Sequence, residues 1–142
     1  MLSQGHHNEG LRLLVVEDSK RVADRLFELL DQVPQVETIG AVESEREAIA
    51  SVRSTDPDVV ILDLHLKQGT GFGVLRSLPA ESERPTVVVL TNFDLPEYRA
   101  QAHALGVSYF LDKANEFDRI PEILEEIAAR RSEDDAHTRL DA

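Results

Sequence analysis

The sequence has 142 residues, 42% of them hydrophobic, a size and composition that suit one compact domain. Its formal net charge of -12, from 27 acidic and 15 basic residues, would repel a phosphate backbone, so we do not expect direct binding to nucleic acid. The absence of cysteine excludes disulfides and thiolate catalysis, and no apolar run approaches the ~20 residues of a membrane span, so we expect a cytoplasmic protein without a membrane partner.

Three segments can be distinguished along the chain. Residues 1–10 are polar and lack the apolar stretch of a secretory signal, so we predict a flexible leader in which His6 and His7 are not expected to bind a metal. Residues 11–131 carry the periodic apolar patterns and form the predicted domain. Residues 132–142 are polar and aperiodic, and we predict that they form a disordered tail.

Apolar runs and helical patterns alternate five times within the predicted domain. In chain order, the predicted strand and helix pairs are 11–16 with about 20–32, 37–41 with 44–53, 59–63 with 72–78, 86–91 with 94–105, and 107–111 with a last helix from 115. Strict alternation predicts an α/β fold, a doubly wound parallel sheet with helices on both faces.

Local signals predict where several helices begin and end. Ser44 and Glu47 form a capping box, in which each side chain bonds a backbone N–H near the start of the helix. Asp94 and Asn115 are the predicted N-caps of the fourth and fifth helices, and Gly106 is the predicted stop of the fourth.

Polar side chains follow four of the predicted strands at the point where each strand ends. Glu17 and Asp18 follow the first strand, Asp63 ends the third, Thr91 ends the fourth and Lys113 follows the fifth. In open α/β sheets ligands bind beyond the carboxyl ends of the strands, so we expect these five side chains to converge on one site.

The predicted group of three carboxylates needs a cation, because carboxylates that lie together repel one another. Hard oxygen ligands of this kind suit Mg²⁺, which also coordinates phosphate oxygens. Asp63 could then attack phosphorus to form an acyl phosphate, while Lys113 and the Thr91 hydroxyl hold the phosphoryl oxygens. These residue types therefore indicate Mg²⁺-dependent acceptance of a phosphoryl group on Asp63.

Over about residues 11–130 the chain resembles the receiver domains of response regulators, the CheY-like family. The motifs that carry the resemblance are LLVVED at 13–18, VVILDL at 59–64, Gly71, VVVLT at 87–91 and GVSYFLDK at 106–113. The resemblance implies a five-stranded sheet in the flavodoxin-like order 2-1-3-4-5. It also implies that a sensor histidine kinase or a histidine phosphotransfer protein donates the phosphoryl group, and it leaves open whether the chain forms a homodimer.

The resemblance further implies a metal ligand and a conformational switch. The backbone carbonyl of His65, two residues past the acceptor, is expected to coordinate Mg²⁺ beside Glu17, Asp18 and Asp63. When Thr91 moves toward the phosphoryl group, the ring of Phe110 is expected to turn inward and to remodel a protein-binding surface. Since no output domain is recognised within these residues, we predict a stand-alone response regulator that signals through a protein partner.

The sequence departs from the family pattern at three positions expected near Asp63. Lys67 stands where the family usually has proline, Asn92 where a small residue is frequent, and Ala114 where proline is frequent after the lysine. We predict that His65, Lys67 and Asn92 modulate the rates of phosphorylation and dephosphorylation, with the imidazole of His65 either occluding or positioning the attacking water. The alternative for His65 is a solvated loop residue without such a role. At Ala114 we expect either a strained site or an altered loop, because a cis bond before a residue other than proline costs about 3 kcal/mol.

Two other functions stay open on the sequence alone. The first is a receiver-shaped interaction module that is not phosphorylated. The second is a phosphatase with an aspartate nucleophile, which would need a general acid two residues past Asp63, where His65 stands.

Overall fold

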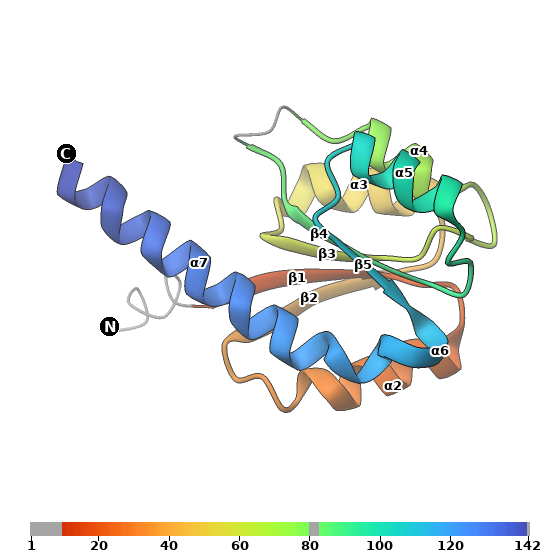
Figure 1. Cartoon of the computed structure of the whole chain (residues 1–142), viewed down its shortest axis with the longest axis horizontal. Coiled ribbons are helices and arrows are strands. Elements are labelled where there is room, and N and C mark those ends of the chain that lie inside the picture. The colour runs from red at the N-terminus through yellow and green to blue at the C-terminus, as the bar shows by residue number, and fades with distance from the viewer. Residues whose placement is uncertain (1–9, 80–82, 142) are drawn as a thin grey trace.

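The computed structural model describes residues 10–79 and 83–141, with side chains placed as far as Glu133. Strands and helices alternate along this part of the chain (Figure 1). The strands are β1 (Leu11–Val16), β2 (Val36–Val42), β3 (Val59–Leu62), β4 (Thr86–Thr91) and β5 (Tyr109–Asp112). The helices are α2 (Lys20–Leu30), α3 (Glu45–Thr55), α4 (Gly71–Arg76), α5 (Pro96–Ala104), α6 (Lys113–Glu116), the 3₁₀ turn η2 (Phe117–Arg119) and α7 (Ile120–Asp141).

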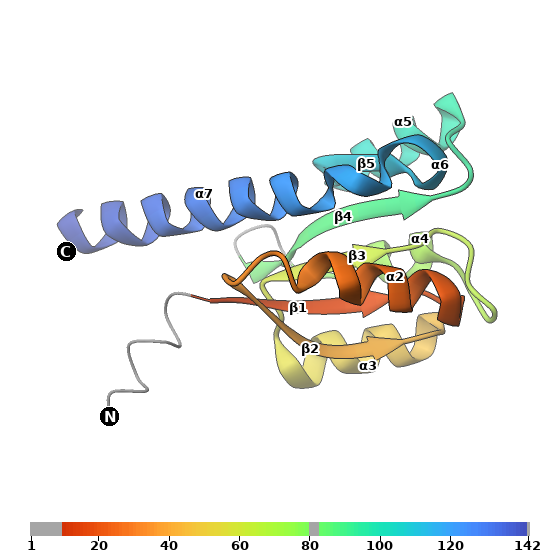
Figure 2. The same ribbon diagram turned by 90° about the horizontal axis from the view of Figure 1, so that it is seen from below.

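The five strands form one parallel sheet in the order β2-β1-β3-β4-β5. Helices α3, α4 and α5 cover one face, and α2, α6 and α7 lie on the other, as two perpendicular views agree (Figures 1 and 2). The doubly wound α/β fold and the strand order predicted from the sequence are therefore confirmed. No described helix is both long enough and apolar enough to cross a membrane.

The apolar strands supply two cores, one on each face of the sheet, because successive side chains of a strand point to opposite faces. In β1, Leu13 and Val15 pack with the helices α2 and α7, whereas Leu14 and Val16 pack on the side of α3, α4 and α5. All four are at most 1% exposed. Double-sided burial explains why β1, β3 and β4 read as nearly uninterrupted apolar runs, and these central strands carry the site at their carboxyl ends.

Helix α5 ends as predicted, and its end delays the start of β5. Gly106 has a φ of +95°, its N–H donates to the carbonyl of His103, and the N–H of Val107 donates to the carbonyl of Ala102. This pair of bonds is the Schellman arrangement that closes helices at a glycine. Because Val107 is part of that closure, β5 begins at Tyr109 instead of residue 107.

The predicted cap at Ser44 is confirmed, since its hydroxyl accepts from the N–H of Glu47 at 3.2 Å. The other two predicted caps are wrong. Helix α5 begins at Pro96 after Leu95, and Asp94 instead pairs with Arg99. The last helical segment begins earlier than Asn115, because Asp112 already caps it.

The C-terminal segment differs from the predicted disordered tail. Helix α7 continues through Asp141, and its last turns extend past the sheet in both views (Figures 1 and 2). Its apolar stripe stops near Ile127, which misled the prediction, but the residues beyond it are mostly good helix formers, and extending an existing helix avoids the cost of nucleation. The predicted leader, with His6 and His7, lies outside the described residues except for Gly10.

Candidate functional site

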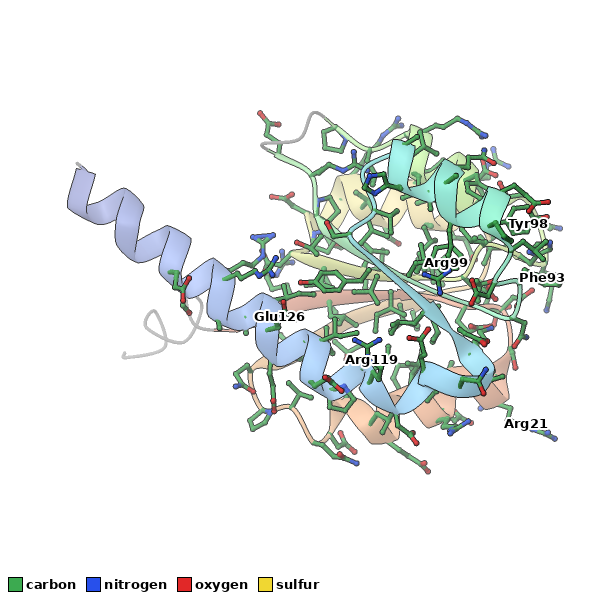
Figure 3. All side chains as sticks on the ribbon, viewed as in Figure 1. Arg21, Phe93, Tyr98, Arg99, Arg119 and Glu126 are labelled. Atoms are coloured by element: carbon green, nitrogen blue, oxygen red, sulfur yellow. The ribbon has the colours of Figure 1, made fainter. Side chains whose placement is uncertain are left out.

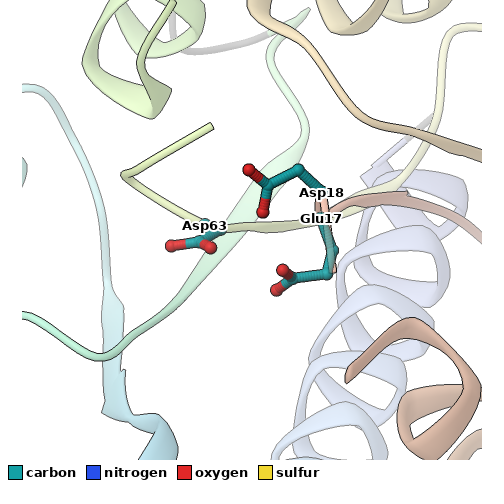
Figure 4. A group of neighbouring side chains, drawn as sticks. All are labelled: Glu17, Asp18 and Asp63. Carbon is teal, nitrogen blue, oxygen red and sulfur yellow. The ribbon is translucent and has the colours of Figure 1, made fainter. Parts of the chain in front are cut away.

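Three carboxylates meet at the carboxyl ends of the two central strands. Glu17 and Asp18 follow β1 and Asp63 follows β3, whose last paired residues are Val16 and Leu62. The N–H of Asp63 continues this ladder by donating to the carbonyl of Val16 at 3.0 Å. One oxygen of each carboxylate lies within 4.8 Å of the others (Figure 4).

Lys113 brings a buried cation to the same place from the start of α6. Its Nζ atom lies 2.8 Å from Oε1 of Glu17 and 2.9 Å from Oδ2 of Asp63. The side chain of Lys113 is 9% exposed, that of Glu17 2% and that of Asp63 6%. These ion pairs are therefore largely shielded from water.

Burial and pairing act on the charges of this group in opposite directions. Burial raises the pKa of the Glu17 carboxyl, as does the charge of Asp63, while the hydrogen bond from Lys113 opposes the rise. Burial lowers the pKa of Lys113, but hydrogen bonds and charges of Glu17 and Asp63 outweigh it and raise the pKa above its ordinary value. The ammonium therefore stays protonated at neutral pH.

Backbone N–H groups orient the two carboxylates bound to Lys113. Oε2 of Glu17 accepts from the N–H of Ser19 at 3.0 Å, and Oδ1 of Asp63 accepts from the N–H of His65 at 3.2 Å. Both oxygens of each group are thus engaged, one by an amide and one by the ammonium. The carboxylates are held in place before any ligand arrives.

The donor set fits a divalent cation such as Mg²⁺. Three carboxylates and one ammonium leave two formal negative charges, which one such cation would balance, and oxygen is the ligand that Mg²⁺ prefers. Asp18 is half-buried and so lies toward the open side of the group.

Thr91 closes β4, the strand next to β3. Val89 pairs with Leu62 across these strands, so Thr91 stands two residues further toward the carboxyl edge. It is fully buried, and its hydroxyl oxygen accepts from the N–H of Phe93 at 3.2 Å. In this structure the hydroxyl is therefore tied to its own loop.

The two aromatic side chains of β5 lie on opposite faces of the sheet. Tyr109 packs against the core beneath α2 and α7, and Phe110 against the core beneath α3, α4 and α5. Both are half-buried. The guanidinium carbon of Arg99 lies 4.6 Å from the centroid of the Phe110 ring, which covers the residue expected to act as the switch.

The residues expected to modulate rates lie on two loops around the carboxylates. The His65 imidazole stacks on the ring of Phe93, with 3.9 Å between centroids and 29° between planes. Lys67 is 67% exposed, and its Nζ lies 3.6 Å from Oε1 of Glu43. Asn92 is exposed. Their effects on rate stay predictions.

The loop after β5 is altered in the way expected for a chain without proline at 114. The peptide between Lys113 and Ala114 is trans, as are the others in the described residues. The N–H of Ala114 donates to Oδ1 of Asp112 at 3.0 Å, a bond that proline could not make. Helix α6 therefore starts directly at Lys113, whose ammonium still reaches Asp63.

Two residues that the sequence analysis did not explain also shape the site. A Cβ added to Gly71 would lie 2.5 Å from the carbonyl oxygen of Asp63, so the turn after Asp63 needs glycine there. Arg99 links Asp94 to Phe110, and its five-residue separation from Asp94 matches no helical spacing that would have revealed the pair.

Comparison with known proteins agrees with this arrangement. The family model of the response regulator receiver domain matches residues 13–125. The chain belongs to this receiver family. It is therefore the receiver domain of a two-component response regulator, with the fold of signalling proteins.

The receiver domain has relatives among longer proteins. It is 30% identical over 114 residues to the sensory transduction protein LytT of Bacillus cereus, covering 80% of this chain and 46% of the relative. It thus spans about half the length of that relative.

Solved structures share the receiver fold. The signal receiver domain of a putative Luxo repressor protein from Vibrio parahaemolyticus has a TM-score of 0.78 at 25% identity, covering 89% of this chain and 96% of that one. The Mn²⁺-bound form of response regulator Rcp1 has a TM-score of 0.70 at 25% identity, covering 82% and 91%.

Proposed function

We propose that the receiver domain accepts a phosphoryl group on Asp63 in the presence of Mg²⁺ and signals through a changed protein-binding surface. The observation that carries the proposal is the buried group in which Nζ of Lys113 lies 2.8 Å from Glu17 and 2.9 Å from Asp63, beside Asp18. In open α/β sheets ligands bind beyond the carboxyl ends of the strands, and phosphoryl transfer depends on positioning and charge neutralisation, which this set can supply.

The proposed chemistry is an attack of one Asp63 carboxylate oxygen on the phosphorus of a phosphohistidine. The new O–P bond forms an acyl phosphate as the N–P bond to the donor imidazole breaks. Lys113 is placed to move from the carboxylate to the oxygens of the phosphoryl group, and the hydroxyl of Thr91 is the second expected partner. Donors of this kind act by neutralising charge that spreads over the transferred group.

Glu17, Asp18, Asp63 and the backbone carbonyl of His65 would hold Mg²⁺. The bound ion would supply charge neutralisation at the phosphoryl oxygens. The fit of the three carboxylates to a divalent cation supports this assignment, and a similar fold binds Mn²⁺ in response regulator Rcp1. The role of the protein is to keep the carboxylates in place, which the N–H groups of Ser19 and His65 do.

The surface that would change lies over the edge strand β5. A groove of about 380 Å³ crosses this strand between α5 and the start of α7, and its lining includes Arg99, Phe110 and Arg119. Because Phe110 forms part of the groove, a change in its rotamer would alter the shape offered to a protein partner. A sensor histidine kinase or histidine phosphotransfer protein is the proposed donor, and a protein partner in the cytoplasm is the proposed downstream target.

Incubation with acetyl phosphate and Mg²⁺, followed by intact mass measurement, tests the proposal. We expect a phosphoryl adduct that hydroxylamine removes, as it does acyl phosphates. Asp63→Asn should abolish the adduct, while Asp24→Asn, a change at a carboxylate that is 61% exposed on α2, should leave it intact. If no adduct forms with acetyl phosphate or with a phosphorylated histidine phosphotransfer protein, the domain is an interaction module that is not phosphorylated. Continuous release of phosphate from simple esters would instead indicate a phosphatase.

A further inference from the structure

Arg99 lies where the loop after β4, the strand β5 and the helix α6 meet. Its Nε and Nη2 atoms both donate to the carboxylate of Asp94, with 3.1 Å between Nη2 and Oδ2. Its guanidinium carbon lies 4.6 Å from the centroid of the Phe110 ring. The edge of one side chain therefore holds the loop, while its face covers an aromatic ring of β5. Figure 3 labels Arg99 among the side chains of the domain.

A weaker contact completes the surroundings of Arg99. Its Nη2 lies 3.8 Å from Oε1 of Glu116, and the same oxygen accepts from the N–H of Asp112 at 3.0 Å. Asp94 provides the close, two-point contact, and Glu116 provides a distant charge. The position of the guanidinium therefore depends mainly on where the loop places Asp94.

The loop that carries Asp94 is itself tied to Thr91. The N–H of Phe93 donates to the Thr91 hydroxyl at 3.2 Å, and Asp94 is the next residue. The hydroxyl, the loop, the Asp94 carboxylate, the guanidinium and the Phe110 ring thus form one continuous series of contacts. A displacement at either end changes the surroundings of the other.

We propose that Asp94 and Arg99 are positioning residues that transmit the state of the Thr91 hydroxyl to the ring of Phe110. The inference rests on the proposed function, in which this hydroxyl turns toward a phosphoryl group on Asp63. When the hydroxyl turns away, it no longer accepts the hydrogen bond from the N–H of Phe93. The loop is then free to shift. Asp94 then draws Arg99 off the Phe110 ring, and the ring is free to turn.

The chemistry of arginine suits this role better than that of lysine. A planar guanidinium can bind a carboxylate at two points and lie over a ring at the same time, whereas an ammonium is a compact point charge. Arg99 and Asp94 are 44% and 34% exposed, so water screens the contacts. A cation over a ring at such a site changes the balance between two ring positions about two- to fivefold. Arg99 therefore favours one position of the Phe110 ring without excluding the other.

Fluorine NMR of the full chain labelled with 4-fluorophenylalanine tests the inference. The chain has five phenylalanines, and the signal of residue 110 is identified by its loss in Phe110→Leu. In the wild type, Mg²⁺ with beryllofluoride, a mimic of the phosphoryl group, should move this signal. We expect Asp94→Asn and Arg99→Gln to move it in the same direction without any addition, and to reduce its response to beryllofluoride about two- to fivefold. Arg99→Lys should behave like Arg99→Gln.

The matched control is Arg130→Gln on α7, which removes an exposed arginine whose Nη2 bonds Glu126 at 2.8 Å, outside the groove that Phe110 lines. It should leave the signal of residue 110 where the wild type has it. Asp94 is the decisive position, because among the described contacts it reaches the ring through Arg99. A signal that moves in Arg99→Gln but not in Asp94→Asn would overturn the inference, as would an undiminished response in both variants.

Failure of the proposed function would look different. The wild type would then form no adduct with acetyl phosphate and show no response to beryllofluoride. The comparison of Asp94→Asn with Arg99→Gln in the untreated protein needs no phosphoryl group. It therefore decides whether the loop positions Phe110 even in that case.

Discussion

The Nζ atom of Lys113 lies 2.9 Å from Oδ2 of Asp63, so the proposed acceptor is ion-paired before any phosphoryl group arrives. The same ammonium contacts Glu17 at 2.8 Å. It therefore stabilises two buried carboxylates in the resting domain, and in the proposed function it also binds the phosphoryl group. Removing the ammonium should therefore lower the stability of the domain and, separately, slow phosphoryl transfer.

Lys113→Met should lower the free energy of unfolding in EDTA by about 2–4 kcal/mol, because Glu17 and Asp63 would lose a buried counter-charge. Mg²⁺ should restore much of the loss, since it would neutralise the same carboxylates. Urea unfolding with and without Mg²⁺ measures both effects. The control is Lys67→Met, whose partner Glu43 is exposed and whose removal should cost at most about 1 kcal/mol. Equal stability of Lys113→Met and wild type in EDTA would contradict the expectation.

Asp18→Asn should abolish stabilisation by Mg²⁺. In the wild type, added Mg²⁺ should raise the midpoint of thermal unfolding, because a ligand that binds the folded state alone stabilises it. The variant should melt higher than the wild type in EDTA, since one of three repelling carboxylates is gone. Asp24→Asn on α2 should keep the response to Mg²⁺. If Mg²⁺ raised the unfolding midpoint of Asp18→Asn as much as that of the wild type, Asp18 would not be a ligand of the ion.

His65→Ala should shorten the lifetime of the phosphorylated state about two- to tenfold, which is the range expected for losing one ring stack. The stack of His65 on Phe93 spans the loops after β3 and β4, so we favour occlusion of the attacking water over its positioning. Phe93→Ala should have a similar effect, and the double variant should be little faster than either single one. Loss of the mass adduct over time measures the rate. An unchanged rate in His65→Ala would contradict a role in lifetime, and a longer lifetime would indicate positioning.

Ala114→Pro should destabilise the domain by about 1–2 kcal/mol although proline is frequent there in the family. Proline would remove the N–H that donates to Asp112 and would disfavour the helical conformation of Lys113. Because Asp112 then has less to cap, Asp112→Ala should cost less in the proline variant than in the wild type. Urea unfolding of the four proteins gives the comparison. A gain in stability would mean that the loop readily adopts another arrangement.

Gly71→Ala should cost more than about 2 kcal/mol, because its Cβ would meet the backbone of Asp63 and Leu64 at 2.5 and 2.9 Å. The matched control is Gly73→Ala in the same helix, where the nearest atoms belong to the flexible end of the Glu45 side chain. The control should be close to neutral. Thermal unfolding measures both, and a tolerated Gly71→Ala would show that the turn after the acceptor can relax.

The fold could be read from the sequence because burial on both faces leaves a simple signature. Runs such as 59–62 are apolar at every position, and helical patterns separate them. Helix ends were harder to predict. Asp94 carries the usual signal of a cap, but Arg99 engages its carboxylate and Pro96 begins the helix one residue later.

The members of the site were predictable, but their pairing was not. The carboxyl ends of neighbouring strands meet by topology, which placed Asp63, Asp18 and Lys113 together. No spacing in the sequence encodes the direction of a side chain. The sequence therefore did not reveal that Lys113 also binds Glu17, or that the Thr91 hydroxyl accepts from the N–H of Phe93. The same holds for the stack of His65 on Phe93.

The length of α7 gives the domain a lever. Ala128 still packs on the core, and Nη2 of Arg131 donates to the carbonyl of Asp58 at 3.0 Å. From Arg131 to Asp141 the helix runs for about 15 Å at the usual rise per residue, so a tilt of about 5° at Arg131 would move its far end by about 1 Å. The base of this helix follows Lys113 by way of α6 and η2, so an adjustment at Lys113 has a route along the chain to the far end of α7.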